Sequence, residues 1–410
     1  MRKNYLIAVI VLILISCTSN EEKDQLGEIM NSLHGKYNEI IANPKDYGLQ
    51  VLYTQIDRDQ NNNPHLHTWS YNVDSSFYFY PASTIKLPVA LLALEKINEL
   101  NVPFLSSDSE MLTDSAYSGQ TKVLIDSTSE SLKPSVAHYV KKIFLVSDND
   151  AFNRLYEFLG QEYINNALAE KGFRNSGIVH RLSIFLSSEE NRHTNPIRFY
   201  DHDTLVYQQA QKIGPPLFRE RNGVKLGKGY MNGDSLVEEP MDFSGKNFMS
   251  LEDLHNILIE TIFPGQLKGK PLFNLTEEDY KLLYRYMSMY PAESICPHYG
   301  DKYDDNYCKF IMYGDYSEPI PRNIRLFNKV GLAYGYVIDV AYVVDLEKKI
   351  EFLVSAVLDV NLNQVYMDDN YAYDSLAFPF FADLGKAVYS YELNRDRLYQ
   401  PDLKRFKFEY

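Results

Sequence analysis

The chain has 410 residues, of which 45% are apolar, 23% charged and 14% aromatic, so it can bury a core and is neither disordered nor fibrous. Its 41 Lys and Arg residues against 55 Asp and Glu residues give a formal net charge of −14. An acidic surface repels phosphate backbones, so we expect no nucleic-acid partner.

The N-terminus has the pattern of an exported and lipid-anchored protein. Two basic residues precede an uncharged apolar run, Tyr5 to Ile15, which is too short to span a bilayer but fits a signal-peptide core. The sequence Leu-Ile-Ser-Cys ending at Cys17 resembles the lipobox of bacterial lipoproteins, in which the Cys is lipidated. We predict a signal peptide over 1–16, an acidic tether over 17–25 and a membrane-anchored protein outside the cytoplasm, with the outer membrane or cell surface favoured. A plain secretory signal is the alternative.

Both ends of the remaining chain carry strand patterns. After a helical pattern from Leu26 to Ile41, Gly48 to Asp57 and His65 to Tyr71 read as a hairpin. Late in the chain, Tyr336 to Asp345 and Ile350 to Val360 are β-branched and apolar enough for adjacent strands.

The segment between these strands, from Ser83 to about Tyr290, reads largely as helices, and Leu376 to Leu393 predicts a closing amphipathic helix. The predicted fold class is therefore α/β (α+β). An antiparallel sheet from both chain ends is flanked by helices, and an all-helical lobe is inserted. We expect one domain of two lobes over 26–400, followed by a tail over 401–410, and a monomer.

The two later cysteines, Cys296 and Cys308, are twelve positions apart in a Pro- and Asp-rich loop. An oxidising compartment permits a disulfide between them, and two buried thiols are the alternative. The chain has no CxxC pair, and the His65 and His67 pair has no third ligand nearby, so we predict neither a metal nor a cofactor.

The first candidate for chemistry is Ser83, which lies three positions before Lys86 at the start of a long apolar run. Residues three apart share a helical face, so the hydroxyl lies beside the amine. A desolvated neutral lysine can take the proton of a serine and make it a nucleophile. The alternative is a helix N-cap serine without chemistry.

Two further polar groups follow in an order that supports this chemistry. Ser147-Asp148-Asn149 lies between apolar helical segments, where Ser147 can relay a proton to a leaving nitrogen and Asn149 can hold a substrate amide or Lys86. Lys329-Val330-Gly331 opens a run of strand character, where the lysine can bind an anionic group and the glycine lets substrate backbone approach.

Together these motifs resemble the superfamily of class A β-lactamases and penicillin-binding DD-peptidases, whose set is S-x-x-K, S-D-N and K-T-G. The resemblance covers nearly the whole mature chain. It implies an acyl-enzyme on Ser83, with Lys86 as base, Ser147 as proton relay, Lys329 as carboxylate ligand and the N–H groups of Ser83 and Leu332 as oxyanion hole.

Three departures from the family pattern stand out. Val330 replaces the usual hydroxyl residue, and enlarged loops around 223–245 and 291–321 could reshape the cleft. The segment after Arg181-Leu182 lacks the usual Glu-x-x-Leu-Asn, so Glu190 with Asn195 is our candidate for the deacylating base and its partner, and Glu189 is the neighbouring alternative.

We therefore predict a serine hydrolase, with β-lactamase-type hydrolysis of a β-lactam or related cyclic amide as the favoured reaction. A DD-peptidase, another serine amidase or an esterase is the first alternative. A surface lipoprotein that only binds its ligand is the second. The expected substrate is a small molecule or a peptidoglycan-derived fragment.

Overall fold

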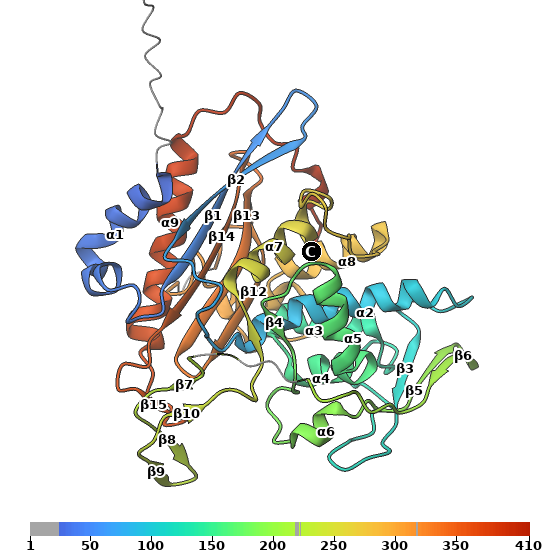
Figure 1. Cartoon of the computed structure of the whole chain (residues 1–410). Helices are drawn as coiled ribbons and strands as arrows, with labels where there is room; N and C mark the ends of the chain where they lie inside the picture. Colours follow the sequence, from blue (N-terminus) through green and yellow to red (C-terminus); the bar gives the residue numbers. More distant parts are fainter. Residues whose placement is uncertain (1–23, 218–220, 222, 317–318) are drawn as a thin grey trace, which may run out of the picture.

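An antiparallel five-stranded sheet organises the computed structural model, which describes residues 24–217, 221, 223–316 and 319–410 (Figure 1). The strand order is β12-β13-β14-β1-β2, so strands from both ends of the chain meet at its centre. The strands are β1 (Gln50–Arg58), β2 (Pro64–Tyr71), β12 (Ile324–Ala333), β13 (Tyr336–Asp345) and β14 (Ile350–Asp359). The predicted sheet is confirmed. The predicted signal peptide, Cys17 and most of the tether lie outside the described residues.

Both faces of this sheet are covered, which explains the apolar runs. In β1, Leu52 and Ile56 point into one hydrophobic core, whereas Val51 and Tyr53 point into a second core on the opposite face. Successive strand side chains alternate between faces, so a strand buried on both sides needs an unbroken apolar run. Every residue of β13 is buried in this way.

Helices from the chain ends cover one face, and helices from the middle cover the other. α1 (Gln25–Ala42) and α9 (Phe378–Asn394) pack together on the face of Val51 and Tyr53, where the Tyr37 hydroxyl donates to Asp383 at 2.8 Å. α7 (Leu251–Ile262) packs on the face of Leu52 and Ile56, and α8 (Glu277–Ser288) lies against β12. The expected first and last helices are therefore confirmed.

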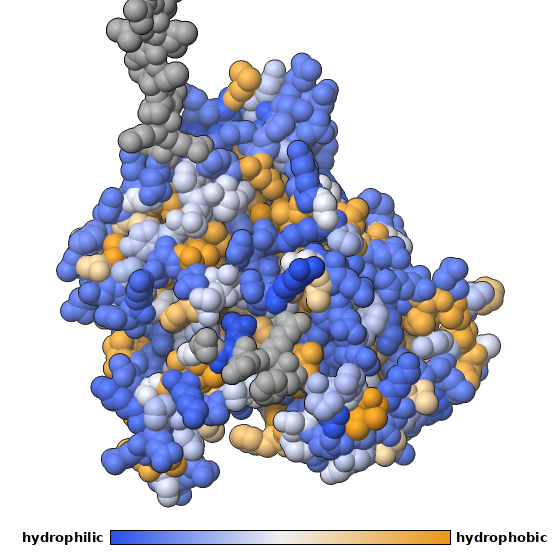
Figure 2. Space-filling view, in the orientation of Figure 1, coloured by the Kyte–Doolittle hydropathy of each residue, from blue (hydrophilic) through white to orange (hydrophobic). Residues whose placement is uncertain are grey.

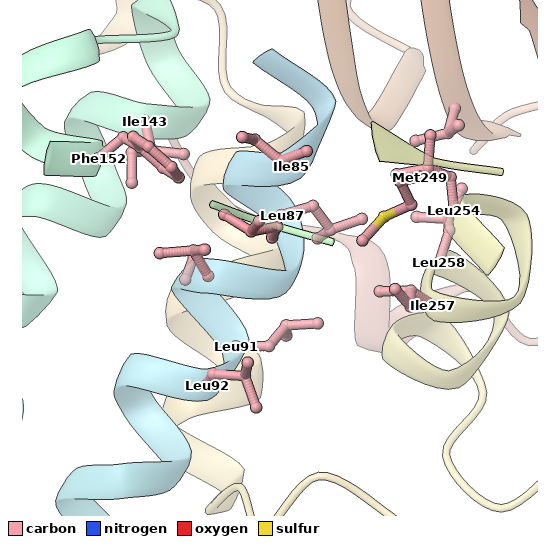
Figure 3. Packing of buried hydrophobic residues seen from close by; sticks show 14 of the residues in the cluster. Ile85, Leu87, Leu91, Leu92, Ile143, Phe152, Met249, Leu254, Ile257 and Leu258 are labelled. Carbon is pink, nitrogen blue, oxygen red and sulfur yellow. The ribbon is translucent and has the colours of Figure 1, made fainter. Parts of the chain in front are cut away.

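The second lobe is built around α2, which is apolar on nearly every side. Figure 3 shows how α2 is enclosed. The α2 side chains of Leu87, Leu91 and Leu92, together with Ile85 just before the helix, lie between two groups of neighbours. Ile143 and Phe152 are on one side, and the α7 region is on the other. Burial all around a helix marks an element enclosed by its neighbours. The helices of this lobe are α2 (Lys86–Leu100), α3 (Val136–Val146), α4 (Asn149–Leu159), α5 (Gln161–Glu170) and α6 (Ser188–Arg192).

The inserted lobe is mainly helical, as predicted, but it is not all-helical, because short strands interrupt it. β3, β5 and β6 form a small sheet, β15, β8 and β9 form another, and two strand pairs complete the set. These strands are short and partly exposed, so they lack the long alternating pattern that sequence analysis detects. Their bounds are β3 (Glu110–Thr113), β4 (Ser176–Gly177), β5 (Ile197–Asp201), β6 (Thr204–Gln209), β7 (Lys225–Leu226), β8 (Gly229–Asn232), β9 (Ser235–Val237), β10 (Met241–Asp242), β11 (Phe248–Met249) and β15 (Val365–Tyr366).

The predicted disulfide is also wrong, since Cys296 and Cys308 are both free thiols. The Cys296 sulfur instead accepts a hydrogen bond from the Glu130 N–H at 3.1 Å, and Cys308 is buried. The loop is held without a cross-link because the 3₁₀ turn Pro291–Glu293 contacts two further 3₁₀ turns, Gly300–Lys302 and Asp305–Cys308.

The last ten residues, which we predicted to be a tail, pack against the domain. Phe406 is buried, with its ring centroid 5.0 Å from that of Tyr342 and 5.2 Å from that of Phe327. The chain ends beside α8, where the Tyr410 hydroxyl is 2.7 Å from the Ser288 hydroxyl (Figure 1).

The face seen in Figure 2 is mostly hydrophilic, with apolar side chains scattered in small groups. Among the described residues, no helix combines the length and the hydropathy that a membrane span requires.

Candidate active site

Ser83 lies on a tight turn between the hairpin segment and α2. The 3₁₀ turn Ala82–Ile85 carries it, and Ala82 has a φ of +47°, a conformation that costs a non-glycine residue about 1–3 kcal/mol. The Thr84 hydroxyl donates to the Pro81 carbonyl at 2.5 Å and braces the turn. The strained residue thus comes directly before the candidate nucleophile.

Lys86 is buried directly beneath that nucleophile. Its Nζ is 2.9 Å from Ser83 Oγ, 2.6 Å from Asn149 Oδ1 and 3.2 Å from Ser147 Oγ, and it also donates to the Ser147 carbonyl. The structure therefore brings together four residues that the sequence analysis selected. Lys86 forms a hydrogen bond with each of the other three.

The environment of Lys86 favours a neutral amine. Burial lowers the pKa of Lys86 well below its usual value, and repulsion from Lys329 lowers it further. A neutral amine has a lone pair that can accept a proton, so Lys86 is equipped to activate the Ser83 hydroxyl.

Ser147 lies where α3 ends and α4 begins. It has a φ of +56°, and Asp148 caps α4 by accepting from the Ala151 N–H at 2.8 Å. This junction turns both the carbonyl and the hydroxyl of Ser147 toward Lys86. The middle residue of the Ser-Asp-Asn motif is therefore structural, and its neighbours face the site.

Lys329 approaches Ser147 from β12, in the second half of the strand rather than at its opening as expected. Its Nζ donates to Ser147 Oγ at 2.8 Å and to the Val330 carbonyl at 2.9 Å. The side chain is 2% exposed, and burial lowers its pKa to about 8. We expected Lys329 to bind a substrate carboxylate, but in the structure its ammonium group donates to protein groups.

Gly331 lies close to the turn that carries Ser83. A Cβ at this position would lie 2.8 Å from the Pro81 carbonyl oxygen and 3.0 Å from the Thr84 methyl carbon. The glycine therefore lets β12 approach this turn, and its expected role in admitting substrate backbone stays a prediction.

A cavity of about 460 Å³ opens onto Ser83. The predicted enlarged loop 291–321 supplies much of the wall, and Leu332 from β12 also lines the cavity. Sequence reasoning missed most of the other wall residues, which belong to no motif and lie on the loop 291–321, at the end of α3 and around the start of α9. The lining residues are Ser83, Val146, Ser147, Asn149, Asn306, Tyr307, Cys308, Phe310, Gly314, Val330, Leu332, Asp374 and Phe378.

Glu190 does not reach this network. Its carboxylate caps α6, accepting from the Ser187 N–H and hydroxyl at 2.8 Å each, and it also accepts from the Ser118 hydroxyl at 2.9 Å. These hydrogen bonds lower its pKa. Glu189 is paired with Arg192, also away from Ser83.

Asn195 is buried in the scaffold of the same loop. Its amide donates to the Asp114 carbonyl at 2.8 Å, and its Oδ1 accepts from Arg181 at 3.4 Å. Arg181 also pairs with the buried Glu157 at 3.0 Å. The expected base and partner therefore shape the loop and do not contact Ser83.

Ser183 is the residue of this loop that touches the site, and sequence reasoning missed it. Its Oγ accepts a hydrogen bond from Asn149 Nδ2 at 2.7 Å. Its neighbour Leu182 is fixed by two backbone hydrogen bonds with the Asn153 side chain, at 2.8 and 3.0 Å. The only signal was its place directly after Arg181-Leu182.

Within the ranges that the structure describes, no three His, Cys, Asp or Glu side chains gather as a metal site.

A sequence comparison covers the part of the chain that carries this network. Residues 36–208 match the model of the β-lactamase enzyme family, and this range contains Ser83, Lys86, Ser147 and Asn149. The part of the chain that carries the network is therefore similar to the β-lactamase enzyme family.

Solved structures of β-lactamases and of a protein named PBP-A cover most of the chain. A β-lactamase from Sphaerobacter thermophilus is 14% identical, over 88% of this chain and 94% of its own, with a TM-score of 0.45. A class A β-lactamase from Clostridium kluyveri is 16% identical, over 90% and 98%, with a TM-score of 0.47. The structure named PBP-A is 15% identical, over 89% and 94%, with a TM-score of 0.47. The comparison with curated proteins gave no significant match.

Proposed function

We propose that this β-lactamase-like protein forms an acyl-enzyme on Ser83 with an amide or ester substrate and hydrolyses it slowly. This is the behaviour of a peptidase or penicillin-binding enzyme rather than of a fast β-lactamase. The observation that carries the proposal is the hydrogen bond from Asn149 to the hydroxyl of Ser183, since no carboxylate occupies that position.

The acylation half of the reaction follows from the contacts of Ser83. Lys86 takes the proton of Ser83 Oγ across 2.9 Å as the oxygen attacks the substrate carbonyl. Ser147, which contacts both Lys86 and Lys329, passes a proton to the leaving group. The N–H groups of Ser83 and Leu332 stabilise the oxyanion, a contribution of about 10²–10³ in rate for each donor.

Deacylation lacks an equivalent base. A positioned general base contributes about 10²–10⁴ in rate, and a serine hydroxyl cannot hold the proton that an attacking water gives up. Among the described residues, no carboxylate hydrogen-bonds to Ser83, Lys86, Ser147 or Asn149. We therefore infer that the acyl-enzyme is long-lived, with Lys86 serving as the remaining base.

Fast hydrolysis of a β-lactam is the second candidate, because the matching family model is described by that activity. A protein that only binds its ligand is the third, but it gives no reason for the short contact between Ser83 and Lys86.

Time-resolved intact mass spectrometry with a fluorescent penicillin distinguishes these three candidate functions. We expect an adduct on wild-type protein that persists after excess penicillin is removed, and none on Ser83→Ala, with both proteins equally folded by circular dichroism. An adduct that disappears with rapid turnover favours the β-lactamase reaction. Absence of any adduct on wild type contradicts the proposal.

We also propose that Cys17 carries a lipid anchor and that the protein works outside the cytoplasm. The lipobox-like sequence supports this. Cys17→Ser should move the protein from the membrane pellet to the soluble extracytoplasmic fraction, because acyl chains would be the anchor. A variant that stays in the pellet refutes the lipid anchor.

A further inference from the structure

We propose that Asp374 makes this enzyme select substrates with a cationic group, an ammonium or a guanidinium, in the leaving half of the scissile amide or ester. The inference rests on the proposed acyl-enzyme on Ser83 and names the substrate class of that site.

The Ser83 cavity is the place where the leaving half binds. Ser83 and Ser147 both line it, and in the proposed acylation Ser147 protonates the leaving atom. Whatever is attached to that atom must therefore extend into the same cavity, between β12, the loop 291–321 and the segment before α9.

Asp374 is the only charged side chain among the described residues that line this cavity. Its carboxylate is exposed and has no hydrogen bond or ion pair with any described side chain or backbone group. An unpaired carboxylate in a cavity wall attracts a cation and repels an anion, most strongly where the ligand displaces water.

The cavity offers little to a carboxylate in the leaving half. The Lys329 ammonium is buried and donates to Ser147 and to the Val330 carbonyl. Val330 supplies a methyl group where the family pattern has a hydroxyl, so one donor to a carboxylate is missing.

Aromatic rings complete a surface that suits a cation. Tyr307, Phe310 and Phe378 line the same cavity, and Tyr307 is 47% exposed. The faces of such rings attract an ammonium or guanidinium within about 6 Å. The Asp374 carboxylate and the faces of the aromatic rings therefore both favour a cationic ligand.

Asp374 is held on a fixed element rather than on a loose loop. It lies in a single π-helical turn, Tyr373–Ala377, that runs into α9. The Tyr373 hydroxyl accepts from the Gly335 N–H at 2.8 Å, which ties this turn to the β12–β13 hairpin. The carboxylate thus keeps its place relative to β12, which carries Leu332 of the same wall.

The test uses three amides with one acyl half and leaving groups of similar size. They are the amides of D-alanine, D-alaninamide and (R)-1,2-diaminopropane, which present a carboxylate, a neutral amide and an ammonium. We expect wild-type kcat/KM, followed by release of the amine, to be at least tenfold higher for the diaminopropane amide than for the D-alanine amide.

Two variants assign that preference to Asp374. Asp374→Asn should bring the two rates within about threefold, since the amide has no net charge. Asp374→Lys should reverse the order. Asp369→Asn is the matched control, because Asp369 is an exposed carboxylate of the same region that does not line the cavity, and it should keep the wild-type ratio.

The outcomes separate this inference from the proposed function. A wild-type ratio near one, or an unchanged ratio in Asp374→Asn, overturns the role of Asp374 while leaving Ser83 acylation intact. If neither penicillin nor any of the three amides acylates Ser83, the proposed function fails, and the inference fails with it.

Discussion

Two buried lysines, Lys86 and Lys329, donate to the same hydroxyl, that of Ser147, at 3.2 and 2.8 Å. Two adjacent ammonium groups repel each other, so the pair divides its roles. Lys86 has the pKa held well below its usual value and acts as the neutral base, while Lys329, with a pKa of about 8, keeps its proton at neutral pH. The charge difference gives the proton relay a direction, from Lys86 through Ser147 to the leaving group.

This division predicts the pH dependence of acylation. Below the depressed pKa of Lys86 the base is protonated and acylation is slow, so the rate should rise with pH. Above about pH 8 Lys329 loses its proton and its charge beside Ser147, so the rate should fall again. The check is kcat/KM for penicillin acylation across the pH range. A rate that stays flat from about pH 7 to pH 9 contradicts the role of Lys329.

A second residue-scale prediction concerns the missing deacylating base. Ser183→Glu places a carboxylate on an exposed position whose hydroxyl now contacts Asn149. It should shorten the lifetime of the penicillin adduct by at least about tenfold, because a general base contributes about 10²–10⁴. The measurement is adduct decay by intact mass.

Glu190→Gln is the matched control for this experiment. The Glu190 carboxylate belongs to the cap of α6, so the adduct lifetime should stay as in wild type. A shorter lifetime in wild type than in Glu190→Gln would restore Glu190 as the base.

The residues of the site differ in how far sequence predicts them. Ser83 with Lys86 was predictable, because residues three positions apart on a helical turn lie side by side. Ser147 with Asn149 was predictable because the two lie in one tripeptide, at the junction of α3 and α4. Ser183 and Asp374 were not, because tertiary contacts bring them to the site: Asn153 fixes the loop of Ser183, and Gly335 fixes the turn of Asp374. Such contacts leave no periodic signal in the sequence.

At the scale of elements, the contact between β12 and the Ser83 turn is the critical one. Gly331→Ala would place a methyl group 2.8 Å from the Pro81 carbonyl, so the strand or the turn must move. We expect a loss of about 1–3 kcal/mol in the free energy of unfolding, typical of overpacking, together with slower acylation of Ser83. Urea unfolding and adduct formation measure the two effects.

Gly35→Ala in α1 is the control for this substitution. Nothing lies within 4 Å of a Cβ there, and the residue is helical, so alanine should stabilise the protein by up to about 1 kcal/mol. If both variants change stability and acylation alike, the close approach of Gly331 to Pro81 is not the cause.

The bounds of a strand were predicted better where more of its residues are buried. β13 and β14 have almost wholly buried residues, so their apolar runs gave nearly correct bounds. β3, β5 and β6 pair only with one another at the edge of the helical lobe, and their partly polar sequences match no strand pattern. Whether such segments form strands depends on pairing with neighbours that are far apart in the sequence.

For the whole molecule, the C-terminal segment tests whether the domain ends at 400 or at 410. Phe406 packs among Tyr342, Phe327 and Tyr284, with a centroid distance of 5.3 Å to the last. Phe406→Ala should therefore cost about 3–5 kcal/mol in the free energy of unfolding, as for other buried aromatic side chains. Urea unfolding provides the measurement.

Lys407→Ala, at the exposed neighbouring position, should change that free energy by less than about 0.5 kcal/mol. If Phe406→Ala is equally mild, the last ten residues are a dispensable tail.

The pairing of β1 with β14 means that the central sheet can form only near the end of synthesis. Val51 lies opposite Ala356, so the central strand pair joins positions that are 305 residues apart. The β1–β2 hairpin alone is at most marginally stable in water, and its partner leaves the ribosome only near the end of synthesis. Contacts of such long range slow folding, since the entropy of closing the loop is lost before the pairing is gained. An unfinished chain therefore presents the unpaired edge of β1 to other chains, and truncation before β14 leaves an aggregation-prone protein.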